Sequence, residues 1–428
     1  MRRLEGYQVL RNRNYRLFWL GQWVSLIGTW MQTVTQAWLL TRLGASPLAL
    51  GMLGAATSAP VLVLVLLGGL VSDHLDRRRV IMATQTLSLL QASLMAALTL
   101  AGIVRPWQII SLAAVLGAIN AFDIPARQAF VVELVGPEHL PNAIALNSTG
   151  FNVARVVGPA IGGLLTAAVG EGVCFLVNAV SYLAVLWSLW RITLPRRASA
   201  PRPAVSQRHA LAAGFSYVIE RPDLRSILAL VGVVSAISIS YRNFLPAMAR
   251  DVLQIGAWRY GLLMAAAGVG AGLGGFLLAG ARLGSDSRRR LLPAGLACFG
   301  LSLGAFALSR SFGLSLVLLA FVGAGGIVYF NATNTFVQLS ADDQHRGRVM
   351  SLYTLMHQGT STLGSLVLGA IANRFGTPAA LEAGAVVCLG AMSAFSGRGL
   401  LAVAGRLTSR AGRSASPSSD RSALPRRQ

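Results

Sequence analysis

The chain contains no lysine and few acidic residues. All 37 of its basic residues are arginine, only 15 of its 428 residues are aspartate or glutamate, and the formal net charge is +22. Charged residues make up 12% of the sequence and hydrophobic residues 54%. A soluble domain needs a charged surface, so this composition excludes a soluble globular protein.

Other absences narrow the function. The three cysteines, Cys174, Cys298 and Cys388, lie far apart in apolar segments. This placement fits thiols packed between helices and gives no metal-ligand spacing. The sequence has no GxxxxGK[ST] phosphate-binding loop, which argues against ATP as a built-in energy source. It also has no His/Glu pair at metalloprotease spacing. We therefore expect neither enzymatic activity nor a metal site.

Apolar stretches of about 20 residues recur along the chain. One crossing of about 30 Å of hydrocarbon takes about 20 helical residues at about 1.5 Å rise per residue. The predicted crossings lie at residues 17–41, 48–71, 80–103, 107–126, 144–169, 173–191, 226–248, 258–280, 291–309, 313–334, 349–372 and 379–401. The sequence thus predicts an all-α integral membrane protein with twelve transmembrane helices.

The arginines are distributed unevenly between the two predicted membrane faces. Most are assigned to the side of the two chain ends and few to the other side, and Arg155 is assigned to neither because it lies deep inside a span. By the positive-inside rule, both termini are predicted to be cytoplasmic. The arginines are divided among separate loops and make no continuous basic surface, so the net charge does not indicate nucleic-acid binding.

The chain divides into two similar halves. A charged loop at Asp73–Arg79 follows the second span, and a similar one at Asp286–Arg290 follows the eighth. Parallel six-span repeats place a transport path between two pseudo-symmetric six-helix bundles. The predicted parts are an amino-terminal bundle at 1–194, a cytoplasmic linker at 195–225, a carboxy-terminal bundle at 226–404 and a disordered Arg- and Ser-rich tail at 405–428.

The first span carries a polar stripe. Its five polar residues are spaced three and four apart, so they fall on one helix face: Gln22, Ser25, Thr29, Gln32 and Gln36. Amide side chains in hydrocarbon need partners or water, so this face is expected to line a cavity. The alternative is hydrogen bonding between helices. The predicted cavity residues of the whole chain are Gln32, Gln36, Asn152, Arg155, Ser238 and Tyr329.

Arg155 is the most specific single candidate for a functional residue because it places a charge inside the fifth span. Such a charge costs at least about 2.5–3.5 kcal/mol unless it faces water or an anion. A functional role is therefore the first interpretation, and pairing with a carboxylate is the alternative. The same span has small residues every four positions, Ala154, Gly158 and Gly162, beside Pro159. They predict close packing of two helix backbones and a bend.

Two segments resemble sequence motifs of the major facilitator superfamily. The stretch Gly69–Arg79 is similar to its loop 2–3 motif but has Asp76 where glycine is usual and His74 where arginine is usual. The stretch Ala154–Gly163 looks like its span-five antiporter motif, with Ala154 in place of the first glycine. Three further segments resemble the enterobactin-exporter and macrolide-efflux branch: Phe122–Phe130, Asn142–Asn147 and Arg346–Ser351. The likeness runs from about residue 7 to 395.

This resemblance implies a twelve-helix exporter in the bacterial inner membrane that works by alternating access. The proton gradient would drive it without a cofactor, and its cargo would be a siderophore, a macrolide or another drug-like compound. Import of a metabolite and a non-transport role as receptor or assembly factor remain the alternatives. We expect a monomer in the lipid bilayer.

The resemblance also implies roles for particular residues. Asp73, Arg77 and Asp123 match a charge-relay cluster that latches the two halves in the outward-facing state, with Arg78 and Arg127 beside it. The arginines of this loop could equally serve only to set topology. The predicted helix-packing residues of the antiporter motif are Gly158, Pro159, Gly162 and Gly163.

Overall fold

The computed structural model describes residues 9–193, 215–280, 285–342 and 345–396, and within these ranges the chain is helical and has no strand. The first bundle comprises α1 (Arg13–Arg42), α2 (Pro47–His74), α3 (Arg77–Leu100), α4 (Pro106–Val169) and α5 (Glu171–Arg191). The second comprises α7 (Pro222–Ser240), the 3-10 turn η2 (Tyr241–Phe244), α8 (Leu245–Ala247), the π turn η3 (Met248–Val252), α9 (Ala257–Gly280), α10 (Ser285–Leu308), α11 (Phe312–Ser340), α12 (Arg346–Phe375) and α13 (Thr377–Ser396).

Helix α4 contains two crossings rather than one. Gly136 has φ 71° and ψ 171°, a conformation that glycine adopts readily, and Pro137 follows it. The chain therefore turns back at Gly136, and residues 137–169 form the fifth crossing. The segment from α7 to η3 is one crossing, so the described helices agree with the twelve predicted. Eight of the described helices are long and apolar enough to cross a membrane by length and composition.

Local signals explain where several helices begin. Asn12 caps α1, because its side-chain oxygen accepts hydrogen bonds from the backbone N–H groups of Asn14 (3.0 Å) and Tyr15 (3.2 Å). Prolines open α2, α4 and α7, where the missing N–H costs nothing. Some of the predicted spans were shorter than the helices in the structure. The fourth crossing continues beyond residue 126, since Pro125 lies inside the helix without ending it.

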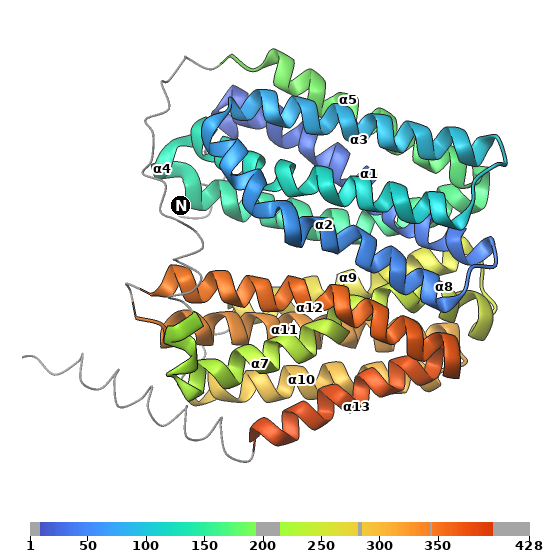
Figure 1. Cartoon of the computed structure of the whole chain (residues 1–428), viewed down its shortest axis with the longest axis vertical. Helices are drawn as coiled ribbons and strands as arrows, with labels where there is room; N and C mark the ends of the chain where they lie inside the picture. Colours follow the sequence, from blue (N-terminus) through green and yellow to red (C-terminus); the bar gives the residue numbers. More distant parts are fainter. Residues whose placement is uncertain (1–8, 194–214, 281–284, 343–344, 397–428) are drawn as a thin grey trace, which may run out of the picture.

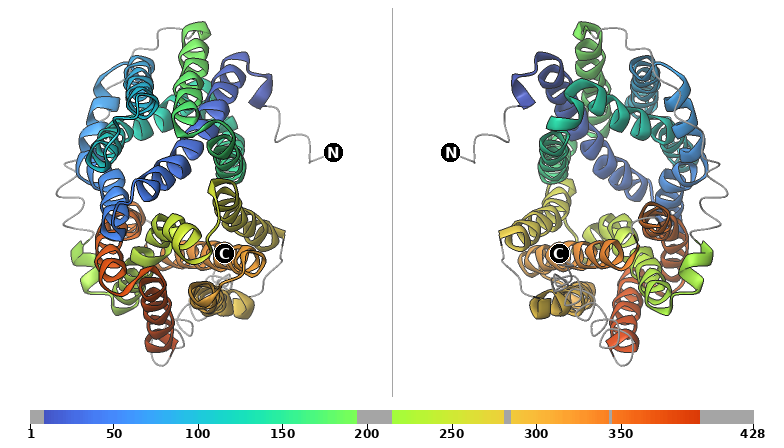
Figure 2. Two further views of the ribbon diagram at one scale, coloured as in Figure 1. Left: turned by 90° about the vertical axis from the view of Figure 1, so that its right-hand side faces the viewer. Right: turned by 90° about the vertical axis from the view of Figure 1, so that its left-hand side faces the viewer.

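The two bundles lie side by side with their helices running in roughly the same direction (Figure 1). We call the end where α1 begins and α13 ends the inner end, and the end where α1 ends and α2 begins the outer end. Figure 2 views the molecule from the outer end and then from the inner end. Most of the predicted linker, 195–225, and the whole predicted tail, 405–428, lie outside the described residues.

The bundles are in contact toward the outer end. Helix α2 packs on α12 there, where the hydroxyls of Ser58 and Thr362 are 2.8 Å apart. The ring of Trp38 on α1 stacks on Tyr260 on α9, with centroids 5.7 Å apart. Arg250 donates a hydrogen bond to the backbone carbonyl of Thr41 across the same end.

Toward the inner end, α2 and α12 diverge (Figure 1). Glycines mark how far the contact reaches. Gly51, near the start of α2, lies against the backbone of Ser365, and Gly359 on α12 meets the side chain of Leu62. Farther inward on α2, the atoms nearest to Gly68 belong to Ala121 and Phe122 of its own bundle. The structure is therefore closed at the outer end and separated at the inner end.

Candidate functional site

The small-residue face of α4 holds this helix against two different neighbours. A Cβ on Gly158 would lie 2.5 Å from the Cβ of Trp30, and one on Gly162 would lie 3.0 Å from the Cα of Met31, so both glycines pack on α1. Gly163 instead faces α9 in the other bundle, where a Cβ would lie 2.9 Å from the Cα of Gly261. The predicted packing motif thus joins α4 both to its own bundle and to the opposite one.

Arg155 lies on the face of α4 between these two contacts. Its backbone carbonyl approaches Gly268 of α9, and its side chain is partly exposed. Val169, where the fifth crossing ends, is 14 residues farther along the chain, which at about 1.5 Å per residue corresponds to about 21 Å from the outer end. The structure therefore places Arg155 near the middle of the membrane, where the bundles meet.

Arg242 on η2, in the other bundle, is the charged residue that acts most strongly on Arg155, and it also acts on His357 on α12. The side chain of His357 is held in place, since the hydroxyl of Ser235 lies 2.7 Å from its Nδ1 and the ring of Phe330 is 4.5 Å away. The mid-membrane site is thus basic and draws its residues from both bundles.

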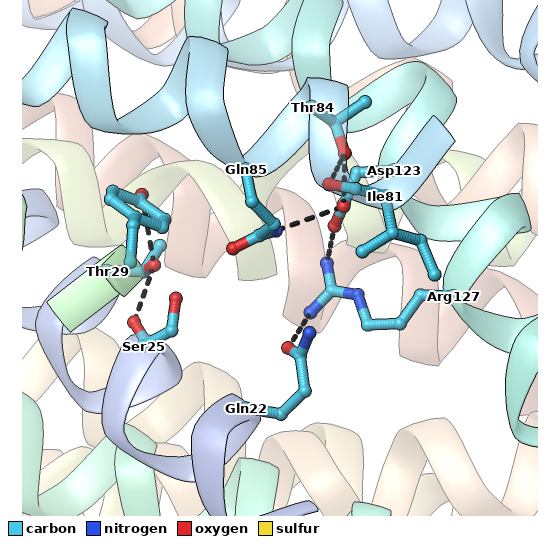
Figure 3. A network of polar contacts seen from close by, with 9 residues as sticks. Gln22, Ser25, Thr29, Ile81, Thr84, Gln85, Asp123 and Arg127 are labelled. Atoms are coloured by element: carbon cyan, nitrogen blue, oxygen red, sulfur yellow. Dashed lines mark hydrogen bonds and ion pairs between the residues drawn. The ribbon is translucent and has the colours of Figure 1, made fainter. Parts of the chain in front are cut away.

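A second polar network lies inside the first bundle (Figure 3). Asp123, only 1% exposed, accepts hydrogen bonds from Thr84 Oγ1 (2.7 Å) and Gln85 Nε2 (3.0 Å) on α3. Arg127, one turn along α4, forms an ion pair with Asp123 and donates a hydrogen bond to Gln22 Oε1 at 2.9 Å. Helices α3 and α4 therefore meet at one buried carboxylate, and α1 joins them through Arg127.

The predicted charge relay is distributed over separate contacts. Arg77 pairs with Glu133 rather than with Asp123, and Asp123 pairs with Arg127. Asp73 is exposed and makes no hydrogen bond or ion pair with any described residue. Arg78 donates a hydrogen bond to the carbonyl of Trp190 at 3.2 Å. The structure therefore does not bring Asp73, Arg77 and Asp123 together.

The polar stripe of α1 corrects one prediction. Gln32, expected in a cavity, is 1% exposed and bonds to Asn178 (2.6 Å) on α5 and to Gln91 (3.2 Å) on α3. Gln36 is also buried, and its Nε2 donates to the carbonyl of Ile109 at 3.4 Å. Both amides connect helices within one bundle, because the stripe faces α3, α4 and α5. The contacts of Gln32 and Gln36 match the alternative interpretation, hydrogen bonding between helices.

The other cavity candidates fall in different places. Tyr329 is 4% exposed and lies inside the second bundle, and its hydroxyl has no hydrogen-bond partner among the described residues. Asn152 bonds only to the carbonyl of Ser148 on its own helix, at 2.9 Å. Ser238 is partly exposed on α7. Of the six candidates, Arg155 lies where both bundles supply side chains.

The sequence-based predictions did not include several residues of these networks. His357 is a lone histidine within a span, and Thr84, Gln85 and Gln91 are polar residues of the third span. Their four- and three-residue spacing could have marked Thr84, Gln91 and Ser88 as one buried face. In the described ranges, no group of His, Cys, Asp or Glu side chains has the arrangement of a metal site.

Comparison with known proteins decides the family. Residues 5–406 match the family model described as transmembrane secretion effector. The chain belongs to this family of major facilitator transporters. It is 24% identical over 379 residues to the staphyloferrin A transporter of Staphylococcus aureus, covering 84% of this chain and 90% of that protein. It is 26% identical over 370 residues to the enterobactin exporter EntS of Shigella boydii, covering 83% and 85%.

Solved structures agree with the family's fold. A bacterial homolog of the human lysosomal transporter Spinster, in an inward-facing and unoccupied conformation, superposes with a TM-score of 0.68 at 17% identity, covering 94% of this chain and 97% of that one. The nucleoside transporter NupG superposes with a TM-score of 0.63 at 14% identity, covering 92% and 98%. This family member is therefore a multi-pass membrane transporter of a small molecule, and not an enzyme.

Proposed function

We propose that this transporter exports a small molecule of the siderophore or drug-like class by alternating access, driven by the proton gradient. The observation that carries the proposal is the meeting of two bundles around a mid-membrane basic site that is closed from the outer end. The names of two relatives, an enterobactin exporter and a staphyloferrin A transporter, support the substrate class.

The orientation that we assign to the molecule gives the step of the proposed export cycle that this structure fits. The loops of the inner end carry most of the arginines, so we assign this end and both termini to the cytoplasm. In the bacterial inner membrane, a transporter whose two bundles are apart at the inner end is open to the cytoplasm. This is the state in which an exporter takes up its cargo, and closure of the inner end with opening of the outer end would release it outside.

The Asp123–Arg127 network is the candidate for proton coupling. Asp123 is the most buried carboxylate among the described residues, and its charge is balanced by Arg127. Protonation would remove the counter-charge of Arg127 and release its guanidinium group. Breaking such a pair is worth a few kcal/mol, which is enough to shift a two-state equilibrium by orders of magnitude.

Accumulation measurements test the proposal. An efflux-deficient bacterium would express the wild type, Asp73→Asn or Asp123→Asn and receive a panel of siderophores, macrolides and cationic dyes, with and without a protonophore. The matched control is Asp76→Asn, because this carboxylate is exposed and lies 3.9 Å from the more exposed Arg79.

We expect cells with the wild type or the control to accumulate less of one compound. The protonophore, Asp73→Asn and Asp123→Asn should each abolish this reduction. Higher accumulation with the wild type would indicate import instead. If no compound differed while the protein was present in the membrane, the export proposal would be wrong.

A further inference from the structure

A groove lies in the first bundle near its inner end. Helices α2 and α3 both pack on the first crossing of α4, but they make little contact with each other. Gly68 seats α2 directly on α4, because a Cβ there would lie 2.0 Å from the carbonyl oxygen of Ala121. Helices α2 and α3 therefore form the two walls of a groove of about 630 Å³, and α4 forms its floor.

The described residues that line this groove are apolar along its length and charged at its inner mouth. The apolar side chains come from all three helices and include Val71, Val80, Ala83, Leu87, Ile119 and Phe122. Leu87 is 51% exposed, so the groove opens away from the bundle core. Asp76 and Arg79 lie at the mouth, where α3 begins. From Arg79 to Leu87 the groove follows eight residues of α3, or about 12 Å.

Arg79 is the positive charge that the mouth offers to a ligand. Its side chain is 83% exposed, and its Nε lies 3.9 Å from the exposed carboxylate of Asp76. Such an exposed pair is weak, so the guanidinium group is free to take a second partner. Asp76 is itself engaged as the cap of α3, where it accepts a hydrogen bond from the Arg79 backbone N–H at 3.3 Å. The neighbouring Arg77 is instead paired with Glu133 of α4.

We propose that this groove binds one phospholipid of the leaflet at the inner end, which we assign to the cytoplasm. One acyl chain would lie between α2 and α3, and the phosphate would lie on Arg79. A groove that opens into hydrocarbon is filled best by an apolar chain, because a polar occupant there would lack hydrogen-bond partners. A guanidinium group binds phosphate oxygens with its planar fork, and arginine near the cytoplasmic leaflet attracts anionic headgroups. The charged mouth above an apolar groove thus matches a headgroup above its chain.

The lipid chain would lie behind the buried Asp123 network. Thr84 lines the groove, and its Oγ1 donates a hydrogen bond of 2.7 Å to Asp123. Phe122, which precedes Asp123 on α4, lines the groove as well. A chain packed against Thr84 and Phe122 would therefore hold α3 and α4 together at the carboxylate where they meet. We infer that the bound lipid stabilises the first bundle, whatever the cargo and the direction of transport.

Native mass spectrometry of the purified full-length protein, transferred from detergent, tests the proposal. The protein would be titrated with phosphatidylglycerol, with diacylglycerol of the same chains, and with glycerophosphoglycerol, the headgroup without chains. Arg79→Gln removes the proposed phosphate contact, and Ala83→Trp fills the groove. The matched controls are Arg16→Gln, an exposed arginine at the inner end of α1, and Leu90→Trp, a 56% exposed position of α3 outside the groove lining.

We expect the wild type and both controls to bind a first phosphatidylglycerol more tightly than later ones. Arg79→Gln should weaken this first binding about fivefold, as expected for one arginine near a headgroup. Ala83→Trp should weaken it about tenfold or more, because the indole ring occupies the space of the chain. The wild type should bind diacylglycerol about fivefold more weakly and should not bind glycerophosphoglycerol.

Thermal unfolding separates loss of binding from loss of folding. Without added lipid, Ala83→Trp and Leu90→Trp should melt at similar temperatures, because both positions face away from the bundle core. Phosphatidylglycerol should raise the melting temperature of the wild type and of Leu90→Trp, and should leave that of Ala83→Trp unchanged.

Three outcomes would overturn the proposal. The first is equal binding of the first lipid by the wild type, Arg79→Gln and Ala83→Trp. The second is binding of diacylglycerol to the wild type as tight as that of phosphatidylglycerol. The third is a dimer that Ala83→Trp abolishes, which would show that a second copy of the chain covers the groove. These measurements need no cargo and no gradient, so their failure would leave the export proposal standing, and failure of export would leave the lipid site standing.

Discussion

Gly163 on α4 and Gly261 on α9 face each other across the two bundles, and a Cβ added to either residue would lie 2.9 Å from the Cα of the other. The same Cβ on Gly261 would lie 2.5 Å from the carbonyl oxygen of Pro159. The outer closure therefore depends on backbone-to-backbone contact, which only residues without a Cβ allow. Glycine at these two positions makes the closed outer end possible.

Enlarging Gly261 should open the outer end. A Gly261→Val substitution would overpack this contact by about 1–3 kcal/mol, which corresponds to about a 5- to 150-fold shift toward the state with separated outer ends. Spin labels at positions 70 on α2 and 351 on α12 would report the inner-end separation, after replacement of the three native cysteines by serine. The inner-end distance should become shorter.

The matched control is Gly272→Val on the same helix, since a Cβ there meets no atom within 4 Å. It should leave the distance distribution unchanged. If Gly261→Val behaved like Gly272→Val, the glycine contact would not govern closure.

Removing the carboxylate of Asp123 should destabilise the first bundle. Loss of one partner of a buried ion pair costs about 3–5 kcal/mol, and the lower part of that range applies because the Arg127 side chain is 29% exposed. Thermal unfolding of Asp123→Asn should show a lower melting temperature, and the double variant with Arg127→Gln should recover part of it. Asp76→Asn, in an exposed pair, should change stability by less than about 1 kcal/mol. Equal effects of both single variants would contradict the assigned network.

Asp73 and Glu133 should have separable effects. Asp73 has no partner among the described residues, so Asp73→Asn should leave the melting temperature unchanged while it lowers transport, if its partner forms only in the other conformation. Glu133→Gln removes the partner of Arg77 and should lower stability by about 1 kcal/mol, as for a partly exposed pair. Parallel melting and accumulation measurements check this, and a stability loss in Asp73→Asn would speak against it.

Gln32 should contribute to stability and not to substrate binding. Gln32→Ala removes its hydrogen bonds to Asn178 and Gln91, at a cost of about 1–2 kcal/mol for two bonds inside a bundle. Thr33→Ala on the same helix is the control, because the Thr33 hydroxyl bonds only to the carbonyl of Thr29, one turn away. Unfolding temperature and half-saturating substrate concentration would be measured together. A changed substrate affinity in Gln32→Ala would contradict this prediction and indicate that Gln32 lines the substrate cavity.

The predictions that succeeded rest on local pattern, and those that failed depended on which neighbour a side chain meets. The spacing of Gln32 and Gln36 correctly placed both on one face of α1, but spacing could not tell whether that face meets water or α3 and α5. Similarly, the resemblance implied a relay of Asp73, Arg77 and Asp123, whereas Glu133, far along the chain, is the partner of Arg77. His357 gave no sequence signal because its contact with Ser235 depends on how α12 packs on α7.

The sequence by itself determined the membrane class and the helix count, and it predicts the orientation of the termini. These properties depend on hydrocarbon thickness and on the distribution of arginine, both of which are read from residues close together in the chain. Only the tertiary structure decided that Gly163 meets Gly261, that Asp123 meets Thr84 and Gln85, and that Gly268 meets the backbone of Arg155. Those pairs join helices whose mutual packing is set by side-chain shape across the whole molecule, which no local pattern encodes.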